Sequence, residues 1–245
     1  MSNRLKLLLS VLCVLAWLSP CYARGPVDTY QQARTILYND IYHDHPVTLY
    51  CNFSYDKKRK VDLPGDFLVP SHPDRAKRVE TEHVVPVENF GRTFPEWRDG
   101  HSACVHSNGQ PFRGRKCVER VNREFMAMEA DLHNLYPAVG VVNAVRGNAN
   151  FAMLDRNASM PFGTACPVRM EGRRVEPPEA ARGPIARSYL YMEDTYSRYR
   201  MSNQQRRLME TWDKMYPPTS WECERNRRIA RVQGNTNRFI DRKCQ

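Results

Sequence analysis

The chain has 245 residues, of which 41% are hydrophobic and 26% charged, a balance typical of globular rather than disordered or fibrous proteins. This length suffices for one large domain or two small ones, each with its own hydrophobic core. Lysine and arginine total 37 against 27 acidic residues, which gives a formal net charge of +10, and 29 of the basic residues are arginine. Because arginine is weakly hydrated and binds phosphate through a planar pair of donors, this excess favours a polyanionic partner.

Residues 1–23 have the pattern of a secretory signal peptide. Two basic residues precede an apolar segment, Leu7 to Leu18, that is short for a membrane span. Cys21 and Ala23 place small residues at the −3 and −1 positions of a cleavage site after Ala23. A retained anchor is the alternative. No later segment approaches about 18 uninterrupted apolar residues, so we expect residues 24–245 to form a periplasmic or secreted protein without a membrane span.

Removal of the signal peptide would leave an even number of cysteines. In an exported chain this predicts disulfides, but the sequence does not choose among the pairings that six cysteines allow. The pairs closest along the chain are favoured, and zinc is the alternative, although the spacings contain no C-x-x-C pair. The six cysteines are Cys51, Cys104, Cys117, Cys166, Cys223 and Cys244, and the favoured pairs are Cys104 with Cys117 and Cys223 with Cys244.

The first half of the mature chain mixes helical, extended and irregular patterns. Apolar residues at helical spacing predict a helix over 28–42. The apolar run 46–53 and the alternating, β-branched segment 79–85 predict strands. Residues 91–116 are rich in Gly, Ser, Asn and charge and have no periodicity, which indicates a long loop.

The second half is mostly helical in pattern. Apolar spacing predicts a helix over 118–131, followed by a short extended piece over 132–136. Pro137 suits the first turn of a helix over 137–146. Absence of repeats and of a clear linker favours a single α+β domain. The remaining predictions are a loop over 161–184 and helices over 184–199, 203–215 and 220–233, the second capped by Ser202.

The chemistry concentrates in two short segments. Glu82 and His83 lie in the strand-like segment T-E-H-V-V-P. Asn134 ends the short extended piece, and Asn143 follows inside the next expected helix, with Arg146 on the same helix face. Each residue alone also has an ordinary structural explanation: a strand histidine, a turn asparagine, a helix cap or a surface ion pair.

Together these segments resemble the endonuclease I family, bacterial periplasmic and secreted nucleases with an HNH-like ββα-metal core. The resemblance covers about residues 28–245 and implies such a core, surrounded by helices and long loops held by disulfides. The segments that carry it are EHVVP (82–86), DLHNL (131–135), VNAVRGN (142–148), WDKMYP (212–217) and WECERNRRIARVQGN (221–235).

The resemblance also implies residue roles. His83 would be the general base, held by a side-chain hydrogen bond from Asn134, and Arg115 would stabilise the phosphate. Glu82 and Asn143 would bind a metal, and their hard oxygen atoms suit Mg²⁺, with another divalent cation as the alternative. A phosphodiester needs such a set, because hydrolysis requires an activated water and positive charge near the phosphate oxygens.

These expectations describe a monomeric, largely sequence-nonspecific endonuclease that cuts DNA, with RNA as a further substrate, and leaves 5′-phosphate ends. Arg146, Arg187 and Arg228 are predicted to bind the nucleic-acid backbone, which gives affinity without sequence information. A noncatalytic basic protein that binds nucleic acid or envelope polymers is the alternative. A metallopeptidase is disfavoured, because the chain has no H-E-x-x-H motif.

Overall fold

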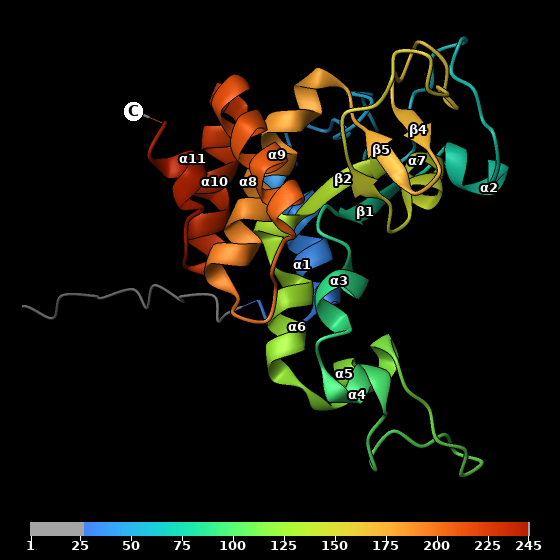
Figure 1. Ribbon diagram of the computed structural model, residues 1–245, viewed down its shortest axis with the longest axis vertical. Coiled ribbons are helices and arrows are strands. Elements are labelled where there is room, and N and C mark those ends of the chain that lie inside the picture. Colours follow the sequence, from blue (N-terminus) through green and yellow to red (C-terminus); the bar gives the residue numbers. More distant parts are fainter. Residues whose placement is uncertain (1–26, 245) are drawn as a thin grey trace, which may run out of the picture.

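The computed structural model describes residues 27–244, so the signal peptide predicted over 1–23 lies outside the described residues. Within this part of the chain, no helix is long and apolar enough to cross a membrane. The fold mixes helices with two small sheets, which agrees with the predicted α+β class. Figure 1 shows the two-stranded sheet near the centre, the long C-terminal helices on one side of it, and helices α4 and α5 at the far end.

The elements follow one another along the chain as α1 (Tyr30–Ile36), the π-helical η1 (Leu37–Ile41), α2 (Pro73–Ala76), β1 (Val79–His83), α3 (Val87–Gly91), α4 (Pro95–Arg98), α5 (Arg115–Val121), α6 (Arg123–Ala130), the 3₁₀ turn η2 (Leu132–Asn134), β2 (Leu135–Val139), α7 (Gly140–Arg146), β3 (Asn150–Phe151), β4 (Arg169–Glu171), β5 (Arg174–Glu176), α8 (Glu179–Thr195), α9 (Asn203–Met215), α10 (Ser220–Gln233) and α11 (Arg238–Asp241).

A β-β-α unit forms the centre of the molecule. Strands β1 and β2 pair antiparallel, with Val79 opposite Val139 and His83 opposite Leu135. Helix α7 begins directly after β2 at Gly140. A Cβ atom there would lie 2.5 Å from the carbonyl oxygen of Arg75, so only glycine lets the helix start this close to the preceding chain. The unit therefore brings β1 and α7, which carry the predicted site, together.

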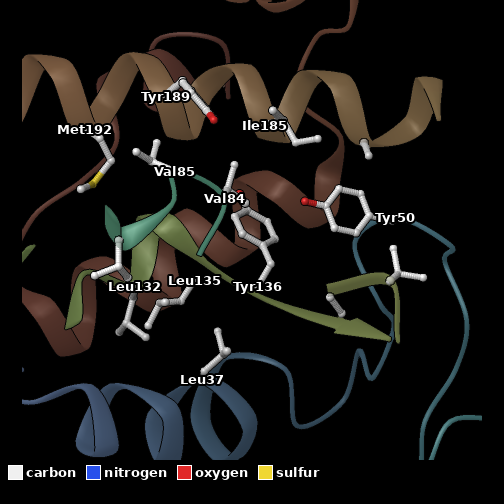
Figure 2. Close-up of a cluster of buried hydrophobic side chains, with 14 of the residues drawn as sticks. Leu37, Tyr50, Val84, Val85, Leu132, Leu135, Tyr136, Ile185, Tyr189 and Met192 are labelled. Carbon is white, nitrogen blue, oxygen red and sulfur yellow. The ribbon is translucent and has the colours of Figure 1, made fainter. Parts of the chain in front are cut away.

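The hydrophobic core packs long helices against this unit. Figure 2 shows Ile185, Tyr189 and Met192 of α8 lying over Val84 and Val85, which follow β1. All five side chains are buried, as are Leu132, Leu135 and Tyr136 around β2. Because close-packed interiors allow little displacement, the end of β1 is fixed by the core rather than by the loops around it.

Two helix predictions are confirmed by the structure. Helices α9 and α10 have the predicted bounds 203–215 and 220–233, and the Ser202 hydroxyl accepts a hydrogen bond from the Gln205 amide as the predicted cap. The helix predicted over 28–42 is also present, as α1 followed without a break by η1. These segments combine regular apolar spacing with clear capping residues.

The strand predicted over 46–53 is wrong, because the chain turns within it. The Asn52 amide donates to the carbonyl of Thr48, and Asn52 itself has a left-handed backbone (φ 54°). The Thr48 hydroxyl also accepts from the Phe53 amide. Only an isolated bridge between Val47 and Ser54 remains of the expected pairing.

The helix predicted over 118–131 is two helices, α5 and α6, which meet at Asn122. The backbone of Asn122 is extended, and its side chain accepts a hydrogen bond from the Phe125 amide, so it caps α6. The apolar spacing continues across the break, which is why periodicity alone predicted one helix.

Pro137 lies inside β2 and not in the first turn of a helix, which corrects the predicted helix over 137–146. It stands opposite Thr81, and its carbonyl accepts from the Leu49 amide. Proline has no amide hydrogen to donate to a partner strand. Both strands of a two-stranded sheet are edge strands, where this loss is tolerated. The loops predicted over 91–116 and 161–184 also contain regular elements, namely α4 in the first and β4, β5 and the start of α8 in the second.

Three disulfides join all six cysteines, and they include both favoured pairs. Cys104–Cys117 holds the long loop to α5, and Cys223–Cys244 holds the C-terminal segment to α10. Cys51–Cys166 joins segments 115 residues apart in the sequence. The chain therefore depends on an oxidising compartment for these three cross-links.

Buried His133 predicts a loss of stability in acid. Its side chain is fully buried, and burial lowers its pKa to about 4, against the opposing charge of Asp131. The unfolded chain binds this proton near pH 6.5, so stability is complete above that pH and is lost as pH falls toward 4, by about 3 kcal/mol. Urea denaturation at pH 7 and pH 4 should show this loss reduced in His133→Gln, whereas His106→Gln, at an exposed site, should retain it. Equal pH dependence in both variants would contradict the assignment.

Candidate active site

Four of the predicted catalytic and metal-binding residues line one cleft. This cleft has a volume of about 620 Å³, and its walls include Glu82, His83, Arg115 and Asn143. Asn134 does not line it, and neither do the three arginines predicted to bind substrate. The cleft is therefore the candidate active site, and its chemistry rests on β1, α5 and α7.

Glu82 is a buried carboxylate held from two sides. One of its oxygens, Oε1, accepts hydrogen bonds from the Tyr50 hydroxyl at 2.6 Å and from the Arg146 guanidinium at 3.2 Å. Burial raises the pKa of Glu82, while the Arg146 charge acts against that rise. A carboxylate removed from water in this way keeps its charge only with a strong cationic partner nearby.

Asn143 stands one helical turn before Arg146 and contacts the same strand. Its amide nitrogen donates to Glu80 Oε2 at 3.0 Å. Glu80 is in turn held by Arg75 and Arg78. These contacts orient the Asn143 side chain, so its amide nitrogen points to Glu80 and its oxygen, Oδ1, has no hydrogen-bond partner among the described residues.

The donor atoms of this cleft fit a divalent cation. No hydrogen bond from residues 27–244 engages Glu82 Oε2 or Asn143 Oδ1, and both residues line the cleft. Carboxylate and amide oxygens are hard ligands, and Mg²⁺ is commonly bound by one or two such groups together with several waters. In the described part of the chain, no group of three or more His, Cys, Asp or Glu residues could hold a metal ion.

The His83 ring is fixed by a backbone carbonyl. Its Nε2 lies 2.8 Å from the carbonyl oxygen of Glu129, so Nε2 carries the proton and donates it. Burial, reinforced by the charge of Arg115, lowers the pKa of His83 to about 3. The ring is therefore neutral at pH 7, with its lone pair on Nδ1, for which the described residues supply no hydrogen bond.

The predicted hydrogen bond between Asn134 and the His83 ring is absent. Asn134 instead accepts from the Val85 amide at 2.7 Å and donates to the Val85 carbonyl at 3.0 Å. Both Asn134 and the pair of bonds are fully buried. Asn134 thus holds the backbone two residues after His83, and the Glu129 carbonyl binds the His83 ring in its place.

Arg115 lies at the mouth of the cleft and is paired with two carboxylates. Its Nε donates to Glu119 at 2.9 Å and also to Glu129. Its guanidinium lies 5.3 Å from the centre of the Tyr30 ring. The side chain is 39% exposed, so it is accessible to an anion that enters the cleft.

Arg146 is a buried structural cation. Only 2% of it is exposed, and it donates to Glu82, to the carbonyls of His83 and Val84, and weakly to the Tyr189 hydroxyl. Its donors point into the protein, so it holds the end of β1 in place. This position does not suit the predicted contact with substrate.

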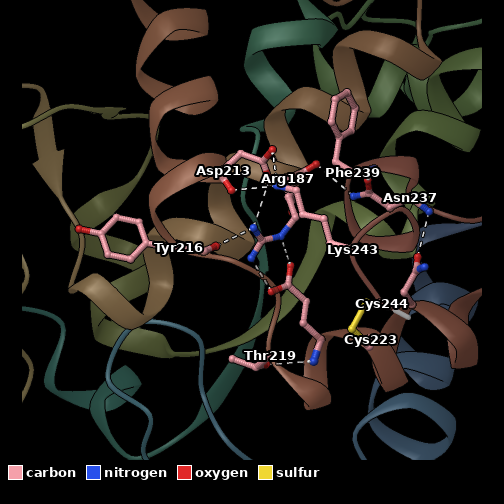
Figure 3. A network of polar contacts seen from close by, with 12 residues as sticks. Arg187, Asp213, Tyr216, Thr219, Cys223, Asn237, Phe239, Lys243 and Cys244 are labelled. Atoms are coloured by element: carbon pink, nitrogen blue, oxygen red, sulfur yellow. Dashed lines mark hydrogen bonds and ion pairs between the residues drawn. A yellow bond between two sulfur atoms is a disulfide. The ribbon is translucent and has the colours of Figure 1, made fainter.

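Arg187 and Arg228 are likewise engaged within the chain. Figure 3 shows the Arg187 guanidinium between Asp213 and the Tyr216 carbonyl, and it also forms two 2.6 Å bonds with Glu222. Only 1% of its side chain is exposed. Arg228 pairs with Asp44 and Glu224 and is 12% exposed. Neither lines the cleft, so neither has the position predicted for a substrate ligand.

Sequence reasoning missed three residues that shape the site and the backbone carbonyl of a fourth, Glu129. Glu80 was detectable, because alternation along a strand places it on the same face as Glu82. The Tyr30 ring, 5.1 Å from that of His83, comes from a distant helix and gave no signal. Tyr50, which donates to Glu82, and Glu129, whose carbonyl holds His83, were equally hidden.

Comparison with known proteins assigns the family. The family model described as Endonuclease I matches residues 18–244. An "Extracellular deoxyribonuclease" of Aeromonas hydrophila is 41% identical over 97% of this chain and 98% of its own length. A "Periplasmic deoxyribonuclease" of the same species is 40% identical over 84% of this chain and 82% of its own. "Endonuclease-1" of Buchnera aphidicola subsp. Acyrthosiphon pisum (strain APS) is 33% identical over 91% and 84%. The relatives are named as nucleases, and the chain belongs to the endonuclease I family.

Replacing Arg146 should destabilise the whole protein. Arg146→Ala leaves Glu82 charged, buried and without its cation, which typically costs about 3–5 kcal/mol. The matched control is Arg92→Ala, since Arg92 pairs with Glu88 at the surface with 69% of its side chain exposed. Such a pair contributes about 0–1 kcal/mol. Urea denaturation measures both losses, and equal losses would contradict a structural role for Arg146.

Proposed function

We propose that the chain is an exported, Mg²⁺-dependent endonuclease that hydrolyses phosphodiester bonds in DNA with little sequence preference. The observation that carries the proposal is one cleft lined by a neutral histidine, two unengaged hard oxygen atoms and an accessible arginine. The family and the names of the deoxyribonuclease relatives support a nuclease that acts on DNA. RNA is proposed as a further substrate, because it carries the same kind of phosphodiester on which the cleft residues would act.

An exported location fits the disulfides and the relatives. The names of two relatives give extracellular and periplasmic locations, and the three disulfides require an oxidising compartment. The chain is accordingly periplasmic or secreted. We propose residues 1–23 as its signal peptide, 24–245 as one nuclease domain, and a monomer as the active form.

In this proposal the β1–β2–α7 unit is the HNH-like ββα core. The strands pair antiparallel and the helix follows at once, so His83 and Glu82 on β1 lie beside Asn143 on α7. A β-β-α arrangement of this kind brings a base and two ligands into one cleft from only two segments of sequence. Helices α8 to α11 then serve as the scaffold that holds it.

His83 is the proposed general base. With Nε2 donating to the Glu129 carbonyl, Nδ1 takes a proton from the attacking water. The lowered pKa keeps Nδ1 unprotonated at neutral pH but weakens it as a base. An anionic phosphate in the cleft would stabilise the imidazolium and raise that pKa again, so the base strengthens when substrate is bound.

Arg115 is the proposed phosphate ligand. To reach a non-bridging oxygen it exchanges a carboxylate partner, Glu119 or Glu129, for the phosphate. Water attack at phosphorus then breaks the bond to the 3′ oxygen, which takes a proton from solvent water, so that a 5′-phosphate and a 3′-hydroxyl remain. Glu82 and Asn143 would hold Mg²⁺, which when bound supplies positive charge beside the phosphate oxygens.

Loss of the base should abolish most cleavage while the protein stays folded. We expect His83→Ala to cut supercoiled plasmid about 10²–10⁴-fold more slowly than the parent chain. Cleavage by the parent should need Mg²⁺ and stop with EDTA. Near-parental rates in a folded His83→Ala protein would overturn the base assignment, and a parent that binds plasmid without cutting it would favour the noncatalytic alternative.

Loss of a ligand should weaken metal binding and cleavage together. We expect Glu82→Gln and Asn143→Ala each to lower Mg²⁺ affinity in calorimetry, because each removes or neutralises one hard oxygen ligand. Asn148→Ala is the matched control, since Asn148 lines the same cleft but its amide donates to Glu88. Unchanged Mg²⁺ affinity in both ligand variants would contradict the metal site.

A further inference from the structure

A second cavity, which the proposed mechanism does not use, adjoins the active-site cleft. It has a volume of about 910 Å³ and runs along α1 and η1 to the loop after Tyr55. Arg34 lines both this cavity and the active-site cleft, so the two hollows are neighbours across one side chain. A chain that leaves the cleft past Arg34 therefore enters this second cavity.

Aromatic rings form much of the second cavity's wall. Tyr38, Tyr42 and Tyr55 line it, and the rings of Tyr38 and Tyr55 meet edge to face at 6.2 Å. Tyr55 is 9% exposed, and its buried hydroxyl has no hydrogen-bond partner among residues 27–244. An unpaired buried hydroxyl is costly. An acceptor bound in the cavity beside it would remove that cost.

Cations surround these rings. Arg34, Lys57 and Arg59 line the cavity, and the Arg59 guanidinium lies 5.0 Å from the centre of the Tyr38 ring. The opposing carboxylate, Asp56, is already engaged by the backbone amides of Lys58 and Lys60. The cavity therefore combines the partly exposed ring of Tyr38, with Tyr42 and Tyr55 buried behind it, with an excess of positive charge.

We propose that this cavity binds unpaired nucleotides of single-stranded DNA, as a continuation of the strand whose phosphate occupies the active-site cleft. The proposal rests on the proposed nuclease function and names the form of substrate that the site accepts. Proteins bind single strands by stacking bases on aromatic rings beside a cationic track, and this cavity offers both features. Its volume lies within the range of about 300–1,000 Å³ found for small-ligand sites, enough for one or two nucleotides.

Duplex DNA would not use the cavity in this way. Its bases are paired and stacked on one another, so a duplex would offer only phosphates to the rim of the cavity. The partly exposed ring of Tyr38 can contact a base only when the base leaves its stack. The cavity should therefore favour single-stranded over double-stranded DNA of the same length.

The test measures binding rather than cleavage. Fluorescein-labelled (dT)₁₂ and a labelled hairpin duplex are titrated by anisotropy against His83→Ala protein in EDTA, over a range of salt concentrations. The test pair is Lys57→Gln with Arg59→Asn, because asparagine tolerates the left-handed backbone of Arg59 (φ 61°). The control pair is Lys58→Gln with Lys60→Gln, which removes the same charge from neighbouring side chains that do not line the cavity.

We expect the test pair to weaken (dT)₁₂ binding about tenfold. The slope of the logarithm of the binding constant against the logarithm of the salt concentration should become shallower by about 1.4, or about 0.7 for each lost phosphate contact. The control pair and the hairpin should change little. Tyr55→Phe should weaken (dT)₁₂ binding about threefold without lowering the melting temperature, since it removes only an unpaired hydroxyl.

Unchanged (dT)₁₂ affinity in the test pair and in Tyr55→Phe would overturn the proposal. Equal losses in the test and control pairs would also overturn it, because the effect would then be general electrostatic attraction. Equal losses for (dT)₁₂ and the hairpin would overturn the preference for unpaired strands. These readouts need no cleavage, so failure of the plasmid assay with the parent chain would separately count against the nuclease function.

Discussion

The buried guanidinium of Arg146 is the constraint on which the candidate site depends. It lies at the end of α7, and it binds Glu82 and the carbonyls of His83 and Val84, so one cation fixes the carboxylate and the backbone of the proposed base. Burying a charge is costly unless its donors are satisfied and its counter-charge is close. Glu82 and the two carbonyls supply the counter-charge and acceptors for both terminal nitrogens, whereas the buried Nε has no hydrogen-bond partner among the described residues. Displacement of any of these three partners would therefore raise the cost of burying this charge.

A second set of contacts holds the same stretch of chain from η2 and α6. Asn134 binds both polar groups of the Val85 backbone, and the Glu129 carbonyl holds the His83 ring. Residues 82–85 are thus fixed at backbone and side chain by three different elements. Precise placement matters in catalysis, since small errors of position cost large factors in rate. The site is accordingly as rigid as the core beneath it, while Arg115, on α5, remains partly exposed and able to exchange partners.

The sequence predicted the residues that line the cleft better than the residues that hold them in place. Glu82, His83 and Asn143 lie in one cleft, as the resemblance to the endonuclease I family implied, although β1 and α7 are far apart in the sequence. The hydrogen bond predicted between Asn134 and the His83 ring was wrong. The Glu129 carbonyl binds the ring and Asn134 binds the Val85 backbone, and only the three-dimensional arrangement decides between these partners. Tyr50 and Glu129 come from segments with no catalytic pattern, and only the folded chain brings them to the site.

The same distinction applies to the elements of the fold. Helices α9 and α10 were predicted to the residue, because apolar period and capping residues agree in both. The predicted strand over 46–53 failed because the apolar run packs into the core through a turn, which period alone does not distinguish from a strand. Pro137 was assigned to a helix on local preference, but pairing with Thr81 places it in β2.

The arginine residues have two separate physical roles, and the net charge alone does not show which residues have which role. Arg146, Arg187 and Arg225 are almost completely buried and serve as multiple donors that join helices and strands, a task for which a planar, permanently charged group is suited. Only the accessible cations can attract a polyanion, and several of them gather at the cleft and at the cavity beside it. Arg34, Arg78 and Arg115 line the first, and Arg34, Lys57 and Arg59 line the second. Other accessible cations are spread over the surface, but these five line the cleft and the cavity beside it, where a nucleic acid bound at the proposed base would meet them.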